Sequence, residues 1–285
     1  MKSRLGTGAL VDAILRGTDR PFAALDLVSA QGTAVAATLT ALAAVAGDSL
    51  AIRNAPIDTK AQILQVWADV QTAGTLQIRS PKLHDNVRGI RYGTTVADTR
   101  PFLPRGVGQR VYPNDVLTVE LAAGAVAGDI ESVCQLIYYP TLPGADARFI
   151  SPDELYRRAI NIFTVENTIS TGTAGGYSGG EAINVENDQF HANGQYALVG
   201  YTCTLEAAAI AWRGVDTGNL RVGGPGLQTE RELTAKWFIW LSQAFGVPLI
   251  PVFSAENKGG ILIDVLQDEN GADPVVTSIF VELSK

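Results

Sequence analysis

The amino-acid sequence predicts a mainly β protein that contains two similar β-sandwiches, a helix between them and a second helix inserted late in the second sandwich. Three observations lead to this fold class. Many short runs are rich in Val, Ile, Thr and aromatic residues and end at Gly, Pro, Asn or Asp. The second part of the chain repeats the first. Two segments carry the start and stop signals of a helix.

Length and composition bound the fold. The 285 residues are 46% hydrophobic and 18% charged, which suits a sizeable core and about two domains. The net charge of −7, with no run of Lys and Arg among aromatic residues, argues against sequence-specific binding of nucleic acid. No apolar run reaches the length of about 18 residues that a membrane span requires. We interpret the longest run, residues 33–47, as core-forming structure, and expect a protein made in the cytoplasm without an export signal.

Matching residues recur in the same order in the two parts of the chain. Gln62 matches Gln195, and Asn86 and Arg88 match Asn219 and Arg221, all at a shift of 133. At a shift of 144 the pairs are Pro104/Pro248, Leu117/Ile261, Val119/Ile263, Glu120/Asp264, Asp129/Asp273 and Ile137/Val281. The step in the shift places 11 extra residues in the second copy, within LQTERELTAKW. Ordered matches with a single step indicate a duplicated fold.

Short segments with the strand pattern occur in both copies. They are residues 61–70, 116–122, 131–139, 195–206, 261–267 and 276–284. Several alternate with period two, and turn residues bound them. Many short strands separated by turns are typical of a sandwich or barrel rather than of a parallel α/β sheet.

Two helices interrupt the strands. In residues 151–162, Ser151 is the expected N-cap, Pro152 the first helical residue and Glu154 the partner in a capping box, and this helix connects the copies. Residues 229–246 form the second helix. It has a capping box of Thr229 and Glu232, a terminal Gly246 and helical spacing of the apolar residues Leu233, Trp237, Trp240, Leu241 and Ala244. A strand through residues 236–242 is the alternative.

The string TAGGYSGGEAIN, residues 173–184, satisfies the G-x-S-x-G pattern of a serine hydrolase around Ser178. A nucleophile elbow needs a strand before the serine and a helix directly after it. Here the strand-like Ile183–Val185 follows, several glycines favour a turn, and the repeat aligns Ser178 with Gly47 in another turn. We therefore predict that Ser178 is a solvated loop residue and not a nucleophile.

The remaining polar candidates point to no catalytic or cofactor site. His84 and His191 occupy non-equivalent positions of the repeat and have no partner motif, which argues against a triad and against a histidine-rich metal site. Cys134 and Cys203 are expected to be small buried side chains, with a single disulfide as the alternative. The remaining candidates are the Asp268, Asn270 and Asp273 turn, either solvated or a Ca²⁺ site, and the recurring Asn86/Arg88 and Asn219/Arg221, expected to tie loops.

This arrangement resembles the double jelly-roll major capsid proteins of tailless, membrane-containing icosahedral bacteriophages of the corticovirus and finnlakevirus type. The resemblance covers residues 21–285 and rests on NVRG…LPRGVGQRVYPNDVLTVEL and NLRVGGPG…VPLIPVFSAENKGGILIDVLQ. It implies an N-terminal arm (1–20), a first jelly roll (21–145), a connector helix (146–160) and a second jelly roll (161–285). The first copy departs from the pattern, because it has only TTVADTRP where the second copy has its inserted helix.

The resemblance also implies a structural function without catalysis, cofactor or metal. The protein would form homotrimeric, pseudo-hexagonal capsomers of an icosahedral shell in the virion, with neighbouring capsomers and a vertex (penton) protein as partners. Its N-terminal arm has basic residues in excess and groups Leu10, Val11, Ile14 and Leu15, as in an amphipathic segment on anionic lipid. A frayed terminus or an arm on a neighbouring subunit is the equal alternative.

Two other classes of protein fit a tandem sandwich. A carbohydrate- or receptor-binding module, as in phage spikes, would need an exposed aromatic platform, for which the candidates are Trp67, Trp212, Trp237 and Trp240. All four lie in apolar patterns that favour burial. A hydrolase would use Ser178. The sequence favours the capsid protein over both.

Overall fold

The computed structural model describes residues 23–53, 61–83, 85–94, 103–104, 106–123, 130–142, 147–170, 175–185, 189–228, 230–267 and 273–284. These residues form a mainly β structure of antiparallel sheets with few helices, as predicted. The predicted N-terminal arm, His84, Asp268 and Asn270 lie outside the described residues, as do Thr229 and most of the TTVADTRP segment.

The first half of the structure, residues 23–142, forms two sheets. One has the order β3 (Ala43–Ala44), β1 (Ala24–Gly32), β9 (Glu131–Tyr139), β4 (Gln62–Asp69) and β7 (Gln109–Arg110). The other has the order β2 (Thr40–Ala41), β8 (Thr118–Ala123), β5 (Gly74–Arg79) and β6 (Ile90–Thr94).

The second half, residues 147–284, also forms two sheets. One has the order β10 (Phe149–Ile150), β16 (Ile250–Ser254), β13 (Gln195–Cys203), β18 (Val275–Leu283) and β11 (Ala159–Thr168). The other has the order β12 (Glu181–Ala182), β17 (Leu262–Leu266), β14 (Ala207–Arg213) and β15 (Val222–Gly226). Short 3₁₀ turns span Val215–Thr217 and Ala255–Gly260.

Both halves repeat one strand order. The order β1-β9-β4-β7 corresponds to β11-β18-β13-β16, and β2-β8-β5-β6 corresponds to β12-β17-β14-β15. Ladder partners refine the sequence alignment. When the core residues Ile78 and Trp212 are matched, Gln77 opposite Glu120 corresponds to Ala211 opposite Asp264, which agrees with the Glu120/Asp264 match.

The match Ile137/Val281 is one residue out of register with the match Gln62/Gln195. Gln62 is opposite Tyr138 and Gln195 is opposite Leu283, so the residue that corresponds to Ile137 is Glu282. Because strand side chains alternate between faces, a slip of one residue assigns a side chain to the wrong face of the sheet. The strand pattern alone could not detect this slip.

The connector helix α2 (Pro152–Arg158) begins as predicted, with the Ser151 hydroxyl accepting a hydrogen bond from the Glu154 N–H at 3.2 Å. It ends earlier than predicted, because β11 starts at Ala159 and pairs with β18. The apolar residues after Ala159 belong to a sheet. Over so few residues, their spacing does not distinguish a strand from the end of a helix.

The inserted helix is two helices, α3 (Arg231–Thr234) and α4 (Trp237–Phe245). Gly246 ends α4 with a φ of 65°, as predicted, and the alternative strand through 236–242 is wrong. The break between the helices packs on β13 at Gly200, where a Cβ would lie 2.3 Å from the Ala235 carbonyl carbon. A side chain at this position would therefore push the helices away from the sheet.

Two apolar clusters form the core. One fills the first half, and the other fills the second half and continues between the halves through Leu25, Leu27, Trp67 and Leu136. The prediction that residues 33–47 form core is wrong. Most of that segment is exposed, and its buried apolar side chains are those of Ala34, Leu42 and Val45.

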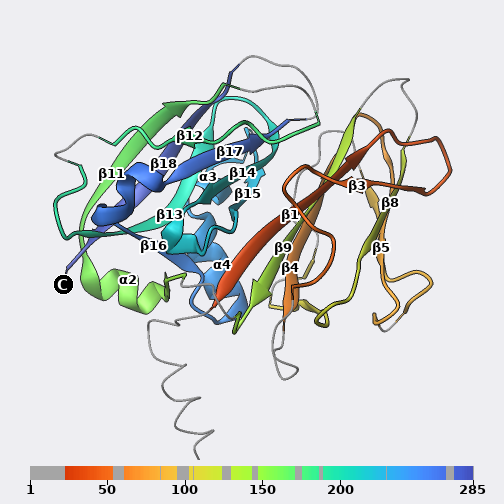
Figure 1. Cartoon of the computed structure of the whole chain (residues 1–285), viewed down its shortest axis with the longest axis horizontal. Coiled ribbons are helices and arrows are strands. Elements are labelled where there is room, and N and C mark those ends of the chain that lie inside the picture. The colour runs from red at the N-terminus through yellow and green to blue at the C-terminus, as the bar shows by residue number, and fades with distance from the viewer. Residues whose placement is uncertain are drawn as a thin grey trace, which may run out of the picture.

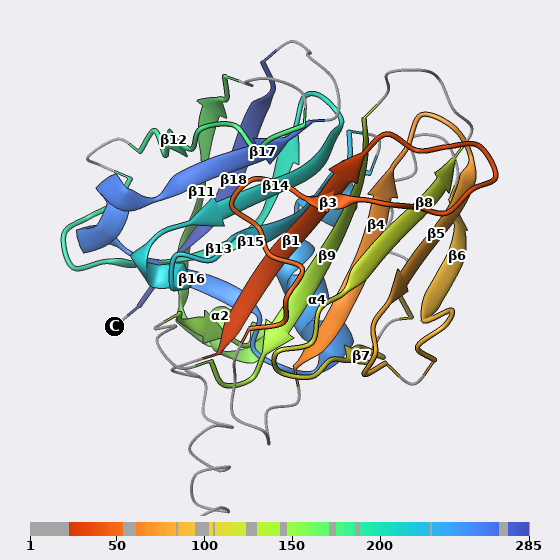
Figure 2. The same cartoon turned by 45° about the vertical axis from the view of Figure 1, so that its right-hand side comes forward.

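The sheets follow one another along the long axis of the molecule. Figure 1 shows β11 and β18 at one end, β5 and β8 at the other, and β1, β9 and β4 between them beside the second half. The turned view in Figure 2 keeps β1 and β9 next to β14 and β15, and β1 packs on β15. Among the described residues, no helix has the length and hydropathy of a membrane span.

Candidate functional site: the contact between the two halves

The contact between the halves has an apolar centre. Leu25 and Leu27 on β1 and Trp67 on β4 are fully buried in the cluster that fills the second half. The Trp67 indole donates a hydrogen bond to the Ala208 carbonyl at 2.7 Å and meets the Trp237 ring edge to face at 6.3 Å. Burial of each such side chain contributes about 1.5–3 kcal/mol. The halves are therefore joined by core-like packing.

A chain of ion pairs lies beside this apolar centre. Arg221, at the start of β15, bonds Asp48 of the first half at 2.5 Å and Asp264 on β17 at 2.9 Å. Arg213 on β14 reaches the same Asp264 carboxylate at 2.7 Å. The Tyr177 ring covers the Arg221 guanidinium at 3.9 Å. Arg221 thus connects carboxylates from both halves under an aromatic ring, a strong arrangement for a buried arginine.

Backbone and side-chain bonds from β1 complete the contact. The Leu27 N–H donates to the Arg221 carbonyl at 2.8 Å. The Ser29 N–H donates to the Asp48 carboxylate at 2.7 Å, and the Ser29 and Tyr177 hydroxyls bond each other at 2.8 Å. Nearby, Asp26 on β1 pairs with Arg53 at 2.5 Å, around a small cavity of about 190 Å³ lined mostly by these charged residues.

Burial dominates the protonation equilibria of this cluster. It raises the pKa of Asp48 to about 6, against the opposing effects of the Arg221 charge and the Ser29 N–H. Burial also raises the pKa of Asp26, against the hydrogen bond and charge of Arg53. The pKa of Tyr177 is raised well above its ordinary value, again by burial, so the phenol stays neutral. The cluster is therefore suited to hold two surfaces together through paired charges.

Ser178 lies next to this contact, in a loop before β12, as predicted. The prediction that it is solvated is wrong, because Ser178 is 4% exposed. Its N–H donates to the Val265 carbonyl and its hydroxyl accepts from the Val265 N–H, both at 2.8 Å. Strand β12 follows where a nucleophile elbow has a helix. Through these two hydrogen bonds Ser178 connects its loop to β17.

The cysteines are free and buried, so the prediction of small buried side chains is confirmed and the alternative disulfide is wrong. Burial raises the pKa of both thiols, and Cys134 lies at the contact between the halves, near the Ala208 carbonyl. His191 is an exposed loop residue, as predicted. Of the suggested Ca²⁺ turn, Asp273 alone is described, and the described residues contain no cluster of metal-ligating side chains.

The recurrence of Arg88 and Arg221 does not reflect one environment. Ile78 is opposite Ile90 and Trp212 is opposite Val222, so the ladders assign Gly89, and not Arg88, as the counterpart of Arg221. Arg88 is exposed on a turn, whereas Arg221 ties the halves together. The predicted loop tie is therefore correct for Arg221, and the aligned Asn219 adopts a left-handed φ of 58° in the turn before it.

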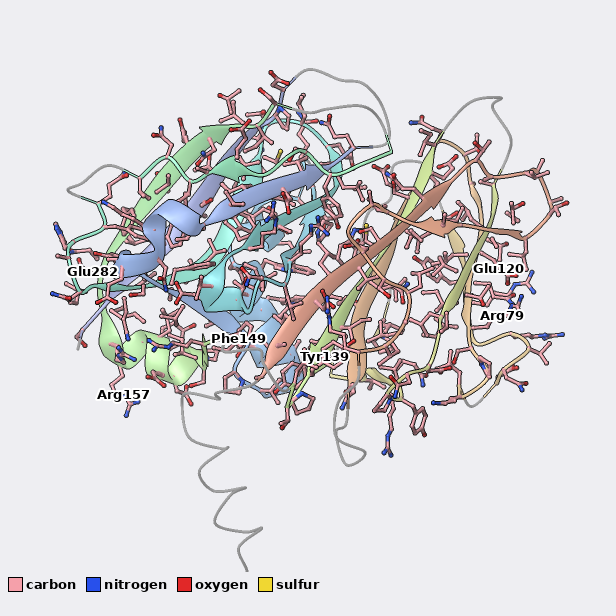
Figure 3. All side chains as sticks on the ribbon, in the orientation of Figure 1. Arg79, Glu120, Tyr139, Phe149, Arg157 and Glu282 are labelled. Atoms are coloured by element: carbon pink, nitrogen blue, oxygen red, sulfur yellow. The ribbon has the colours of Figure 1, made fainter. Side chains whose placement is uncertain are left out.

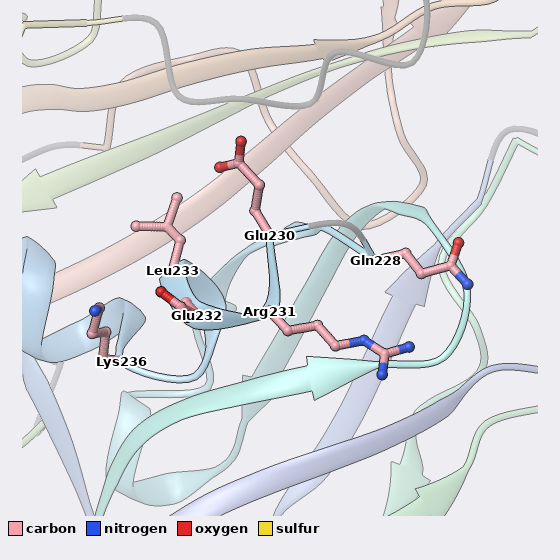
Figure 4. A pocket seen from close by; sticks show the side chains of 6 residues that line it. All are labelled: Gln228, Glu230, Arg231, Glu232, Leu233 and Lys236. Atoms are coloured by element: carbon pink, nitrogen blue, oxygen red, sulfur yellow. The ribbon is translucent and has the colours of Figure 1, made fainter.

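The tryptophans do not form an exposed platform. Trp67, Trp212 and Trp237 are fully buried, and Trp240 is half-buried and stacked on Trp237 at 5.2 Å. A surface cavity of about 560 Å³ lies on α3, and Figure 4 shows that the charged side chains around it point in different directions. This cavity has no convergent set of polar groups of the kind that orients a ligand.

The ion pair Arg213–Asp264 has a counterpart in the first half. By the ladders, Arg79 on β5 and Glu120 on β8 occupy the same two positions, and they form a two-bonded pair at 2.8 and 2.7 Å. Figure 3 shows them at the end of the molecule remote from the second half. Their side chains are 39% and 12% exposed, whereas that of Asp264 is 1% exposed. The acidic residue is thus more buried in the second half than in the first, whereas the two arginines are similarly exposed, Arg213 by 32%.

The sequence did not predict most residues of this site. Asp26, Asp48, Arg53 and Tyr177 stand in loops and strands without a motif. One signal was present. Glu120 aligns with Asp264 at a shift of 144, but Arg79 and Arg213 are 134 residues apart, one residue away from the shift of 133 of the neighbouring matches, so the sequence alignment did not pair these arginines.

Comparison with protein-family models gives no match, and no curated protein matches the chain significantly. Among solved structures, the crystal structure of the PBSX exported protein XepA is similar over 94% of this chain and 87% of that chain. The sequence identity is 9% and the TM-score is 0.26. A TM-score this low does not indicate a shared fold.

Proposed function

We propose that the protein is a double jelly-roll major capsid protein, whose homotrimers form pseudo-hexagonal capsomers of an icosahedral bacteriophage shell. The observation that carries this proposal is the common strand order of the two halves. The strands are counted from β1 in the first half, with β2 and β3 as one strand, and from β11 in the second half, where β10 is an additional short strand. In each half the first strand then lies beside the last, the last beside the third, and the second beside the seventh. Eight strands in two sheets with this order are typical of a jelly roll, a fold of viral capsid domains.

The contact between the halves supports self-assembly. A face of one half covers a face of the other, and on the equivalent face of the first half the Arg79–Glu120 pair is partly exposed. If neighbouring chains repeat the contact, three chains close a ring of six similar units, with no association surface left over around the axis. A pseudo-hexagonal unit of this kind can tile a shell with near-equivalent contacts.

The proposal includes the partners that the resemblance implies. These are neighbouring capsomers, a vertex protein and an internal membrane that the N-terminal arm would touch, and the protein would reside in the virion. It would act without a cofactor, without catalysis and without reading a nucleic-acid sequence. The charge pairing between the halves and the burial of the tryptophans support a structural function over a ligand-binding one.

Light scattering and electron microscopy of the purified full chain test this function. We expect a particle of close to three times 30.2 kDa with a six-cornered outline, or closed shells. A chain that stays monomeric at high concentration would contradict the proposal. Specific binding on a glycan array by that monomer would then favour a carbohydrate-binding module.

A further inference from the structure

The exposed strand β11 has a counterpart that is fully covered within the chain. From the Gln62/Gln195 match, the ladders assign Leu27 opposite Leu136 to the same position as Ile162 opposite Val281. Leu27 is fully buried between the halves, whereas Ile162 is 70% exposed. Both positions thus carry an apolar side chain, although nothing within the described residues covers Ile162. The adjacent Ile160 is exposed as well.

Strand β11 is also the edge of its sheet, and most of its ten residues are exposed. A long, open edge strand with apolar side chains is a surface that proteins usually blunt or cover. Ile162 and Thr164 share their face of the sheet with Val281 and Ile279 of β18, directly opposite them in the ladder. We call this surface, formed by Ile162, Thr164, Ile279 and Val281, the β11 face.

The counterpart surface of the first half lies on β5. Thr75, Gln77 and Arg79 alternate there with the core residues Leu76 and Ile78 and point away from the core. Thr75 and Arg79 are half-buried, and Gln77 is 4% exposed, with its amide donating to the Val87 carbonyl of the adjoining turn at 3.0 Å. They correspond to Ala209, Ala211 and Arg213 on β14, the strand whose Ala208 carbonyl accepts the bond from Trp67 of the first half. We call this surface of β5, with the adjoining β6 and β8, the β5 face. A groove of about 750 Å³, lined largely by small side chains of residues 37–39, 73–75 and 122–123, lies at the Gly74–Thr75 end of this surface.

We infer that the β11 face of one copy binds the β5 face of the next copy and repeats the contact between the two halves. The inference rests on the proposed function, because it names the surfaces by which the trimer closes. The two faces lie at opposite ends of the long axis, so a head-to-tail ring can use both in every copy (Figures 1 and 3). A heterologous contact of this kind closes a ring when its rotation fits.

The contact within the chain indicates what meets Ile162. The Leu27 N–H donates to the Arg221 carbonyl, and the ladder counterpart of Arg221 is Gly89. Ile162 therefore packs at the β5–β6 turn of the neighbour, where Val87 is 71% exposed. That turn is held in place, because the Val87 and Arg88 N–H groups donate to the Asp85 carboxylate at 3.0 and 2.9 Å. A rigid turn loses little conformational entropy on binding.

The charges of the β5 face also suit burial. Arg79 and Glu120 already pair within the chain, as Arg213 and Asp264 do under the first half. Covering a preformed pair is less costly than burying either charge alone. The mostly neutral β11 face then meets a surface whose charges are this pair and the exposed Arg91 of β6, opposite Gln77.

The first test compares two exposed apolar residues. Ile162→Asp places a charge on the β11 face, whereas Val107→Asp changes a residue that is 62% exposed on neither face. Both variants should keep the wild-type melting profile as monomers, because both side chains are exposed. By light scattering over a dilution series, Ile162→Asp should raise the concentration of half-assembly about tenfold or more, and Val107→Asp should not change it.

The second test locates the contact directly. A chain with Ile162→Cys and Val87→Cys should form covalent dimers and trimers with a short bismaleimide, since the native cysteines are buried. The matched control, Ile162→Cys with Val107→Cys, should stay largely uncrosslinked.

The outcomes separate this inference from the proposed function. A wild-type trimer that tolerates Ile162→Asp and gives no Val87 crosslink would overturn the choice of faces and leave the capsid function standing. A wild-type chain that never leaves the monomer would overturn both. A trimer lost with Ile162→Asp and crosslinked through Val87 supports both.

Discussion

Arg79 and Arg213 show how two equivalent residues of a duplicated chain can lie in different environments. Each pairs with an acidic residue on the neighbouring strand, Glu120 or Asp264. Around Arg213, the covering first half brings Asp26, Asp48 and Arg53 close to the pair, whereas the Arg79 pair remains at the surface. The residue type and its partner recur, but burial differs, and burial sets how much the pair contributes and how it titrates.

At this scale, we expect Ser178→Ala to destabilise the protein by about 1–3 kcal/mol, because the substitution leaves the buried Val265 N–H without its hydroxyl acceptor. The control is Ser170→Ala, an exposed serine, which should stay within about 0.5 kcal/mol of the wild type. Chemical denaturation of both variants measures the difference. Equal stability of the two variants would contradict the bond between the Ser178 loop and β17.

Asp48 should make stability depend on pH. Its pKa is raised from 3.8 in the unfolded chain to about 6 in the fold, chiefly by burial. The folded protein therefore binds more protons than the unfolded chain between these values, and stability rises as the pH falls through 6 toward 4. Relative to Asp48→Asn, the wild type should gain of order 1–3 kcal/mol over this window.

Melting temperatures of the two proteins from pH 4 to 7.5 check this expectation, with the groups around Asp48, namely Arg221, Asp26 and the Ser29 N–H, unchanged in both. If the wild type instead loses stability relative to Asp48→Asn on acidification, then Arg221 outweighs burial and holds the carboxylate ionised.

At the scale of elements, the helices of the second half depend on one close approach. The turn between α3 and α4 rests on β13 at Gly200, and α4 brings Trp237 to Trp67 and to the Gly223 carbonyl, which accepts its indole hydrogen bond at 2.9 Å. The position of the helices on the sheet is thus linked to the contact between the halves. A substitution in β13 that moves α4 should therefore also change the surroundings of Trp67.

We expect Gly200→Ala to lower the free energy of unfolding by about 1–3 kcal/mol or more, as overpacking of a core does. The new Cβ would lie 2.3 Å from the Ala235 carbonyl group, so the helices must move. Gly179→Ala is the matched control, because nothing lies within 4 Å of its Cβ position. Near-ultraviolet circular dichroism should change for Gly200→Ala and stay constant for Gly179→Ala; the same spectrum for both would show that the helices are not held at Gly200.

For the whole molecule, the contact between the halves is part of the core. The apolar cluster of the second half continues into β1, β4 and β9 of the first half, and Arg221 joins carboxylates of both. An interface between independent domains is usually more polar and contributes less to the stability of the fold. Neither half buries Leu27 or Trp67 without the other.

The two halves should therefore unfold together. Calorimetry of the full chain under conditions in which light scattering shows a monomer should give one transition with equal calorimetric and van't Hoff enthalpies. Two resolved transitions, one for each half, would show that the contact contributes little to stability. Arg221→Ala should lower the single transition, because it leaves Asp48 and Asp264 without their common partner.

The sequence by itself determined the mainly β class, the strands with alternating patterns, the start of α2, the Gly246 stop and the existence of a repeat. These follow from local physics, because side-chain periodicity, capping and glycine geometry act within a few residues. The Glu120/Asp264 match agrees with the ladders because both residues lie in the same strand of their half, β8 or β17, opposite the equivalent strands β5 and β14.

Only the tertiary structure decided the rest. A one-residue register slip, the exposure of residues 33–47 and the burial of Ser178 depend on strands far apart in the sequence. The ion pairs of Arg221 span residues 48 to 264, and no local pattern encodes which loop faces which sheet. Leu27 and Ile162 occupy the same position and are both apolar, but Leu27 is buried between the halves and Ile162 is 70% exposed, because burial is a property of the assembled fold and not of the strand.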